Sequence, residues 1–230
     1  MTLIDLSREI THRMQGFPTH PPVIISQFAQ HDDIRETFGL KYSSATMYLS
    51  LGDHSGTHVD SPSHFNPDPK AAAIDEMPLE DFFTEAVCLD LSHKPLKTDI
   101  SIADLEKAEK AAGITIQAGD TVLLYTGFAE KTLGTPAFIT DFQGLTKESA
   151  EWLGAKGIRM FGVEAISPGR PGKTNFEVHN VCRDMGFTHI EGLINLGAVA
   201  GKGRFRFIGF PLKIKGGTAS PIRAVAWIDD

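Results

Sequence analysis

HSGTHVDSPSH, residues 54 to 64, gathers three of the chain's nine histidines and one aspartate within eleven positions. The residues able to bind a metal are all at even-numbered positions: His54, His58, Asp60 and His64. Because side chains alternate along an extended backbone, an extended segment would point all four to one face. This phasing indicates a metal site, and the alternative is a solvated loop that happens to be rich in histidine.

A shared metal ion restricts how this segment can run. In a straight strand, His54 and His58 would be about 13 Å apart at roughly 3.3 Å per residue. Ligands of one ion at ~2.1 Å lie within about 4 Å of each other. A helix would turn Asp60 away from His58 by about 200°, and Gly56 and Pro62 disfavour a helix. We therefore expect an extended segment bent sharply at Gly56, since glycine adopts backbone angles closed to other residues.

The residue types indicate which ion would bind and what else the segment does. Two imidazoles and a carboxylate suit Zn²⁺ or another divalent first-row ion, and they leave positions open for water and substrate. His64 lies four residues beyond Asp60. Its ordinary pKa of about 6.5 suits acid–base work. We predict that His64 carries a proton and does not bind the metal.

Composition restricts the class of protein. A length of 230 residues suits one domain with a substantial core. A net charge of −7 and a pI of about 5.7 argue against nucleic-acid binding and against an anionic membrane surface. The N-terminus has charges where a signal peptide would be apolar. Cys88 and Cys182 lie in apolar contexts, which predicts buried thiols of a cytoplasmic protein.

Apolar periodicity predicts a mixed α/β arrangement. Apolar and β-branched runs predict strands at 2–6, 46–51, 86–91, 121–126, 160–163, 188–193 and 223–228. Helices are expected at 101–113, 146–157 and 174–186, each ending at a glycine. Ser101 with Asp104, and Thr174 with Glu177, have the spacing of capping boxes.

The opening segment resembles the signature H-x-G-T-H-x-D-x-P-x-H of the cyclase family of metal-dependent hydrolases, which includes kynurenine formamidases and isatin hydrolases. LIDLSREI (3–10) and FRFIGFPLKIKGGTASPIRAVAW (205–227) are similar to its first strand and its C-terminal segment. The resemblance implies a single compact α/β domain, residues 1–230, with a mixed, barrel-like β core and flanking helices of the swivelling β/β/α type. It also implies a homodimer or homotetramer, for which the glycine- and proline-rich N-terminal third is a candidate exchange arm.

The same resemblance implies roles for individual residues. The metal ligands it implies are His54, His58 and Asp60. It implies that His64 is the catalytic acid or base. A second ion would be held by His179 and Glu191, with Asp60 bridging both ions, so one or two Zn or Mn ions are expected. Our element assignment places His179 on the third helix and Glu191 on the strand that follows.

We expect hydrolysis of an amide-type C–N bond in an aryl formamide or a cyclic amide such as isatin. His64 would relay a proton to the leaving nitrogen. Three alternatives stay open: a polyketide-type cyclase using the same metal site, another lactone or amide hydrolase of the family, and a metal-dependent binding protein without catalysis. Phe17, with Phe28, is a candidate wall for an aromatic amide substrate.

Several other positions carry weaker expectations. Glu164 stands where many relatives have aspartate, and Thr57 where kynurenine formamidases often have alanine, so a pocket contact and that particular substrate are in question. His20 could face the pocket, whereas His189 has no partner at ligand spacing. Surface positions are expected for His12, His31 and His93.

Overall fold

Short apolar runs of the sequence form the strands at the centre of the fold. The structure is a computed structural model that describes residues 1–39 and 43–229. Four of these runs pair in parallel in the order β5-β7-β9-β10. They are β5 (Phe83–Asp90), β7 (Thr121–Tyr125), β9 (Met160–Val163) and β10 (Thr188–Glu191). Such runs are buried on both faces, as parallel strands generally are.

Antiparallel strands extend this parallel centre on both sides. Within the described residues the full order is β1-β13-β11-β5-β7-β9-β10-β4-β12, a curled nine-stranded mixed sheet. The added strands are β1 (Thr2–Asp5), β13 (Val225–Ile228), β11 (Phe205–Ile208), β4 (His58–Asp60) and β12 (Ala219–Pro221). The predicted α/β domain with a mixed, barrel-like β core and flanking helices is confirmed.

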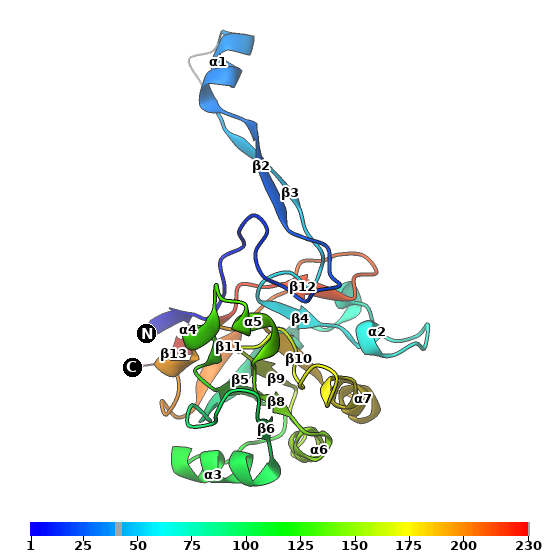
Figure 1. The fold of residues 1–230 in the computed structure, drawn as a ribbon. Coiled ribbons are helices and arrows are strands. Elements are labelled where there is room, and N and C mark those ends of the chain that lie inside the picture. The colour runs from blue at the N-terminus through cyan, green and yellow to red at the C-terminus, as the bar shows by residue number, and fades with distance from the viewer. Residues whose placement is uncertain (40–42, 230) are drawn as a thin grey trace.

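The core has two layers, one on each face of the sheet. Alternate residues of β5 divide between them: Val87 and Leu89 pack beneath the helices, while Ala86 and Cys88 pack on the opposite face. The helices that cover the first face are α3 (Ile102–Ala112), α6 (Lys147–Ala155) and α7 (Asn175–Met185) (Figure 1). Both cysteines are buried free thiols, as expected.

The three predicted helices are present, but one predicted cap is wrong. Ser101 and Asp104 form the expected capping box of α3. Thr174 has helical backbone angles and makes no side-chain cap for α7. Its hydroxyl oxygen instead accepts a hydrogen bond from the backbone N–H of Arg170 at 2.9 Å. The loop that precedes α7 therefore uses the threonine that the sequence pattern assigned to the helix.

Short elements connect this frame. The short helices are α1 (His31–Phe38), α2 (Pro62–Phe65), α4 (Phe128–Thr132) and α5 (Ala137–Thr140). The 3₁₀ turns are η1 (Ile74–Glu76), η2 (Leu79–Phe82) and η3 (Leu196–Ala198), and β6 (Asp99–Ile100) pairs with β8 (Gly144–Leu145). No helix in the described residues is long and apolar enough to cross a membrane.

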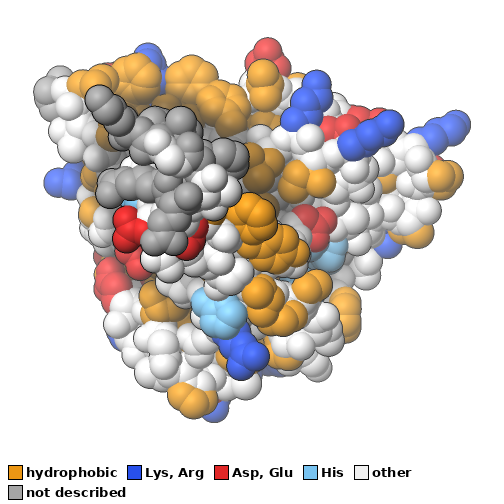
Figure 2. All heavy atoms as spheres, turned by 90° about the horizontal axis from the view of Figure 1, so that it is seen from above, with side chains coloured by type: hydrophobic (Ala, Val, Ile, Leu, Met, Phe, Trp, Pro, Cys, Tyr) orange, Lys and Arg blue, Asp and Glu red, His pale blue; other side chains and the backbone are white. Residues whose placement is uncertain are grey.

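A β-ribbon projects from the body, and we call its described residues, 24–39 and 43–50, the arm (Figure 1). It consists of β2 (Ile24–Ala29), paired antiparallel with β3 (Thr46–Ser50), and α1. Every residue of β3 is exposed. The strand predicted at 46–51 is therefore present, but it lies in the arm and contributes nothing to the core. Seen from above, hydrophobic side chains form several patches on this face of the molecule (Figure 2).

Candidate metal centre

The bend predicted at Gly56 brings the HSGTHVDSPSH segment onto the sheet. Gly56 has a φ of +71°, in the left-handed region that favours glycine. Directly after it, β4 pairs antiparallel with β10, with Glu191 opposite His58. Two segments far apart in sequence thus place their polar side chains in one buried region.

Asp60 lies at the centre of this region and is 1% exposed. Its Oδ1 is 2.9 Å from His54 Nδ1 and 3.6 Å from His58 Nε2. Its Oδ2 faces the other way, 3.3 Å from His189 Nε2 and 4.0 Å from His179 Nε2. The two oxygens of one carboxylate therefore face two different sets of imidazoles.

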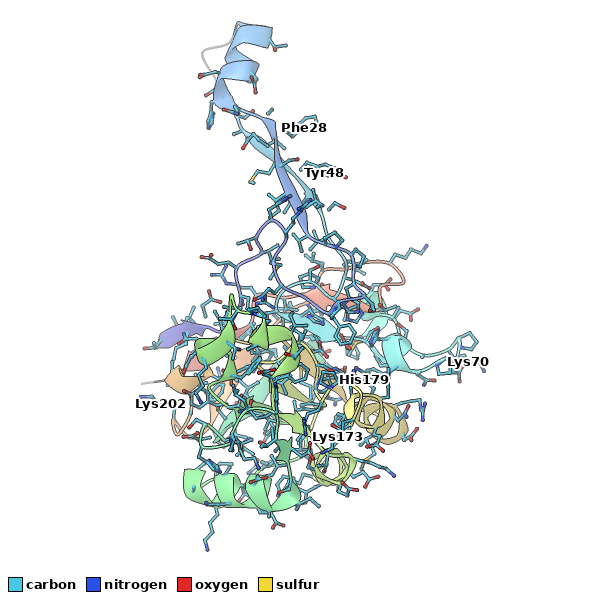
Figure 3. All side chains as sticks on the ribbon, viewed as in Figure 1. Phe28, Tyr48, Lys70, Lys173, His179 and Lys202 are labelled. Carbon is cyan, nitrogen blue, oxygen red and sulfur yellow. The ribbon has the colours of Figure 1, made fainter. Side chains whose placement is uncertain are left out.

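The potential ligand atoms fall into two groups that share Asp60, each with its atoms within 4.8 Å of one another. The first group is His54, His58 and Asp60. The second is Asp60, His179, His189 and Glu191. The structure thus brings together every residue that the sequence and the resemblance named as a ligand, and adds His189. Figure 3 shows His179 on α7 at the edge of this region.

His189 was interpreted as lacking a partner, and that interpretation is wrong. It is fully buried, and its Nε2 is 3.2 Å from Glu191 Oε1. Its ring stacks on Phe161, with centroids 5.5 Å apart. The signal was present in the sequence: residues 189 and 191 of one strand point to the same face because side chains alternate.

His64 lies beside the two groups but on a different kind of element from the one expected. Pro62 begins the one-turn helix α2, so the extended backbone of the segment ends at Ser61. A proline is tolerated at the first position of a helix, where its missing N–H would be unpaired anyway. His64 Nε2 is 3.7 Å from Asp60 Oδ2, and the side chain keeps 30% of its surface exposed. His64 therefore reaches both the polar cluster and solvent.

The electrostatics of the cluster favour charged carboxylates. Burial tends to raise the pKa of Asp60, but His189 and His54 outweigh burial and lower it. The pKa of Glu191 is likewise lowered, against the effect of burial, by the neighbouring imidazoles of His189 and His58. Burial lowers the pKa of His64 to about 4, so this imidazole is neutral at pH 7.

Two buried atoms show that the cluster suits a cation. His58 Nε2 and Asp60 Oδ1 have no hydrogen-bond partner within the described part of the chain. Buried polar atoms rarely stay unpaired, and each such case needs an explanation. Imidazole nitrogens and carboxylate oxygens converging within a few ångströms are a donor set that fits a divalent first-row ion.

A cavity of about 470 Å³ opens above the cluster. Phe17, Phe65 and Phe176 line it, together with His20 and four of the ligand candidates: His54, Asp60, His179 and Glu191. The position of Phe17 agrees with the expected aromatic wall. Phe28 does not, because it is on the arm with 76% of its surface exposed (Figure 3).

His20 faces this cavity, as its place in the proline-rich loop had allowed. Its ring centroid is 4.9 Å from that of His54 and 5.4 Å from that of Phe17. Its Nδ1 is buried and has no hydrogen-bond partner among the described residues. His20 therefore lies beside His54 in the lining of the cavity.

Glu164 and Thr57 lie outside the cavity lining. Glu164 is 1% exposed and accepts hydrogen bonds from the backbone N–H groups of Thr126, Phe128 and Ala129 at the start of α4. The hydroxyl of Thr57 donates to the carbonyl of Gly192 at 2.6 Å. The side chains of both residues hydrogen-bond to backbone groups, and neither side chain lines the cavity.

The curled mixed sheet and the shared histidine–carboxylate cluster define a metal-dependent hydrolase. Residues 4–170 match the family described as putative cyclase, and the chain belongs to this family. It is 27% identical over 228 residues to a kynurenine formamidase from Salinibacter ruber, covering 98% of this chain and 97% of the relative. It is 29% identical over 222 residues to an isatin hydrolase from Roseibium aggregatum, covering 90% and 82%.

Solved structures agree with this assignment. An isatin hydrolase bound to the product analogue thioisatinate is 27% identical, with a TM-score of 0.84 over 99% of this chain and 92% of that chain. Isatin hydrolase A from Ralstonia solanacearum is 24% identical, with a TM-score of 0.86 over 99% and 92%, and supports the fold alone. The resemblance on which the fold and the hydrolase expectation rested is confirmed.

Proposed function

We propose that residues 1–230 act as one enzyme domain that hydrolyses an amide-type C–N bond, in an aryl formamide or a cyclic amide such as isatin. The observation that carries this proposal is the division of Asp60, whose two oxygens face separate ligand groups at the floor of an aromatic cavity. Relatives named kynurenine formamidase and isatin hydrolase support the substrate class.

The residues that would hold the metal follow from the two groups. One ion would be bound by His54, His58 and Asp60. A second would be bound by Asp60, His179, His189 and Glu191. Zn and Mn both accept such nitrogen and oxygen ligands. When bound, a divalent ion supplies a Lewis acid that lowers the pKa of water to ~7 and polarises a carbonyl.

The protein's own contribution to the reaction centres on His64. A neutral imidazole at the edge of the cluster can accept a proton from the attacking water and return it to the leaving nitrogen. The pKa of about 4 leaves His64 in this neutral form at pH 7. Its exposed edge faces the cavity where a substrate would sit.

The cavity lining supports an aromatic substrate. Phe17, Phe65 and Phe176 provide flat apolar surfaces, and ring pairs of this kind favour offset or edge-to-face contact. Phe176 is also one of the most exposed apolar side chains of the body. A bound aromatic ring would cover it.

The test is hydrolysis by metal-replete protein. We expect the protein to hydrolyse N-formylkynurenine or isatin with release of titratable acid. We expect Asp60→Asn to abolish both metal binding and turnover. Acid release separates hydrolysis from the cyclase alternative, because ring closure of a polyketide releases no such acid. Metal binding without turnover of amides or lactones would instead favour the non-catalytic alternative.

We also propose that the protein works as a homodimer or homotetramer in the cytoplasm, in pairs joined through the arm. An isolated two-stranded ribbon is marginally stable in water. The arm nevertheless exposes Phe28, Met47, Tyr48 and Leu49. A second copy of the chain would cover them reciprocally, as the two-fold symmetry of most homodimers allows. Free buried thiols are consistent with a reducing compartment.

A further inference from the structure

The far ring nitrogen of each imidazole in the cluster also has a partner, and His54 differs from His58 and His179 in the kind of partner. His58 and His179 direct Nε2 at the carboxylates, while their Nδ1 atoms lie 3.1 and 2.7 Å from the backbone carbonyls of Gly56 and Asn175. His54 is reversed: its Nδ1 faces Asp60. Its Nε2 faces a side chain, the hydroxyl of Thr218, at 3.1 Å.

Thr218 in turn is bound to a carboxylate outside the cluster. Its hydroxyl donates to Asp53 Oδ2 at 2.8 Å, and its backbone N–H donates to the same oxygen at 3.0 Å. Asp53, Thr218 and His54 therefore form a chain of hydrogen bonds that begins at the loop before Gly56 and ends at the cluster. We call these three residues the relay.

The direction of each bond in the relay is fixed by chemistry. An ionised carboxylate only accepts hydrogen bonds, so the Thr218 hydroxyl must be the donor to Asp53. A hydroxyl has one hydrogen, so toward His54 the same oxygen can only accept. The proton of a neutral His54 must therefore be on Nε2, which leaves the lone pair on Nδ1.

The contact on the other side of the ring agrees with this tautomer. His54 Nδ1 and Asp60 Oδ1 are 2.9 Å apart, yet Asp60 Oδ1 has no hydrogen-bond partner among the described residues. With the proton on Nε2, two lone pairs face each other across this gap. A cation between them would convert that repulsion into coordination by both atoms.

We infer that Asp53 and Thr218 are positioning residues that hold His54 in its Nε2-protonated tautomer, so that Nδ1 is the metal-binding atom. This inference rests on the proposed metal-dependent function, but it concerns residues to which no role has been assigned. Groups that orient metal-binding histidines from behind commonly change metal affinity about 10–100-fold when they are removed.

The test compares Thr218→Val, which keeps the shape but loses the hydroxyl, with Thr218→Ser, which keeps the hydroxyl. We expect Thr218→Val to weaken Zn²⁺ binding, measured by competition with a chelator, about 10–100-fold. Thr218→Ser should stay close to wild type. In metal-free, ¹⁵N-histidine-labelled protein, long-range proton–nitrogen spectra should place the His54 proton on Nε2 in wild type and release that preference in Thr218→Val. The His54 signal is identified by its absence from the spectrum of His54→Gln.

A second variant keeps the inference testable if Thr218→Val does not fold. In Asp53→Ala the Thr218 hydroxyl loses its acceptor, so the hydroxyl is free to donate to His54 Nε2. His54 should then carry its proton on Nδ1, and Zn²⁺ affinity should fall.

Three results would overturn the inference: unchanged Zn²⁺ affinity in Thr218→Val, an equal loss in Thr218→Ser, or a wild-type His54 protonated on Nδ1. Failure of the proposed function looks different. In that case wild-type protein would bind no Zn²⁺ or hydrolyse no amide, while the spectra of the metal-free protein would still decide whether the relay sets the tautomer.

Discussion

Asp60 offers one carboxylate oxygen to each set of imidazoles, and this explains why a short aspartate occupies the position. The residue is buried in the three-residue strand β4, where a longer side chain would carry its oxygens past His54 and His58. Replacing one oxygen with an amide NH₂ puts a donor where the imidazoles need an acceptor. Substitution at Asp60 should therefore affect both groups together, whereas substitution at His179 should affect only the second.

His64→Ala is expected to lower kcat about 10²–10⁴-fold, the usual contribution of a positioned proton carrier. Bound metal should stay at the wild-type level, because His64 belongs to neither ligand group. Steady-state kinetics with elemental analysis measure both. His93→Ala, at an exposed histidine outside the cavity lining, is the matched control. Near-normal turnover in His64→Ala would refute its assigned role.

In a plot of kcat/KM against pH, the loss of activity on the acid side should occur at a lower pH than a histidine of ordinary pKa would give. His64 accepts a proton only when neutral, so activity is present above its pKa and is lost as the pH falls through it. Burial lowers that pKa to about 4. We expect kcat/KM to show no histidine inflection near pH 6.5 while metal occupancy, measured in parallel, is constant. An inflection there would mean that a different group titrates.

At the scale of elements, Glu164 is the N-terminal anchor of the short helix α4. It accepts hydrogen bonds from three backbone N–H groups and from the hydroxyl of Thr126. Burial raises the pKa of Glu164, and these hydrogen bonds act in the opposite direction because they favour the charged carboxylate. The extra methylene of glutamate, compared with aspartate, lets the side chain span the start of α4 from its place after β9.

Glu164→Ala should lower the free energy of unfolding by about 2–3 kcal/mol, because it leaves buried donors without the charged acceptor they share. Chemical denaturation measures this loss. The Zn²⁺ content of the folded variant should be unchanged, since Glu164 lies outside both ligand groups. Glu106→Ala, at an exposed carboxylate on α3, should alter stability little. A comparable loss in that control would contradict the explanation.

The sequence predicted elements whose signals are local. The bend at Gly56 followed from ligand spacing, and the cap of α3 from residues three positions apart. Elements stabilised by distant partners were missed: β4 and β12 are three residues long, and they pair only with segments far away in sequence, β4 with β10 and β12, and β12 with β4. The sequence predicted an extended backbone at His64, but His64 lies on a short helix. Sequence alone does not distinguish a proline at the first position of a helix from a proline that prevents a helix.

The site followed from sequence only where its residues are close together or where a family pattern named them. His54, His58 and Asp60 were within reach of a spacing argument. His179 and Glu191 came from resemblance, because no local pattern connects them with Asp60. Thr218 was out of reach, since its contact with His54 joins positions 164 residues apart.

At the scale of the whole molecule, the arm has too little contact with its own body to account for its apolar surface. Phe28→Asp combined with Tyr48→Asp should convert a wild-type assembly into monomers, because charges would be buried without partners in the proposed interface. Light scattering during gel filtration reports the mass, which is 25.0 kDa for one chain. Leu79→Asp, at an exposed apolar residue of the body, is the control and should preserve the assembly. A monomeric wild-type protein would contradict the proposed pairing.

Removing the metal should destabilise the entire fold, because the two ligand groups join β4, α7 and β10. Binding to the folded state alone adds about 2.7 kcal/mol when free metal is at 100 times Kd. We expect the Tm to fall in chelator and to rise again with added Zn²⁺. Asp60→Asn should make the Tm insensitive to both additions, and a chelator-sensitive Asp60→Asn protein would indicate another binding site.

The position of β4 in the sheet also determines when, during translation, the metal centre can form. This strand pairs with β10 and β12, and the bond from Thr188 to the backbone of Asp60 spans 128 positions. A nascent chain that has made His54, His58 and Asp60 therefore has the ligands but nothing to hold them in place. The ordered centre cannot form until β10 and β12 have been translated, near the far end of the sequence. Metal captured earlier on the ribosome would bind a flexible peptide, and the mature affinity would appear only after β12 has been translated.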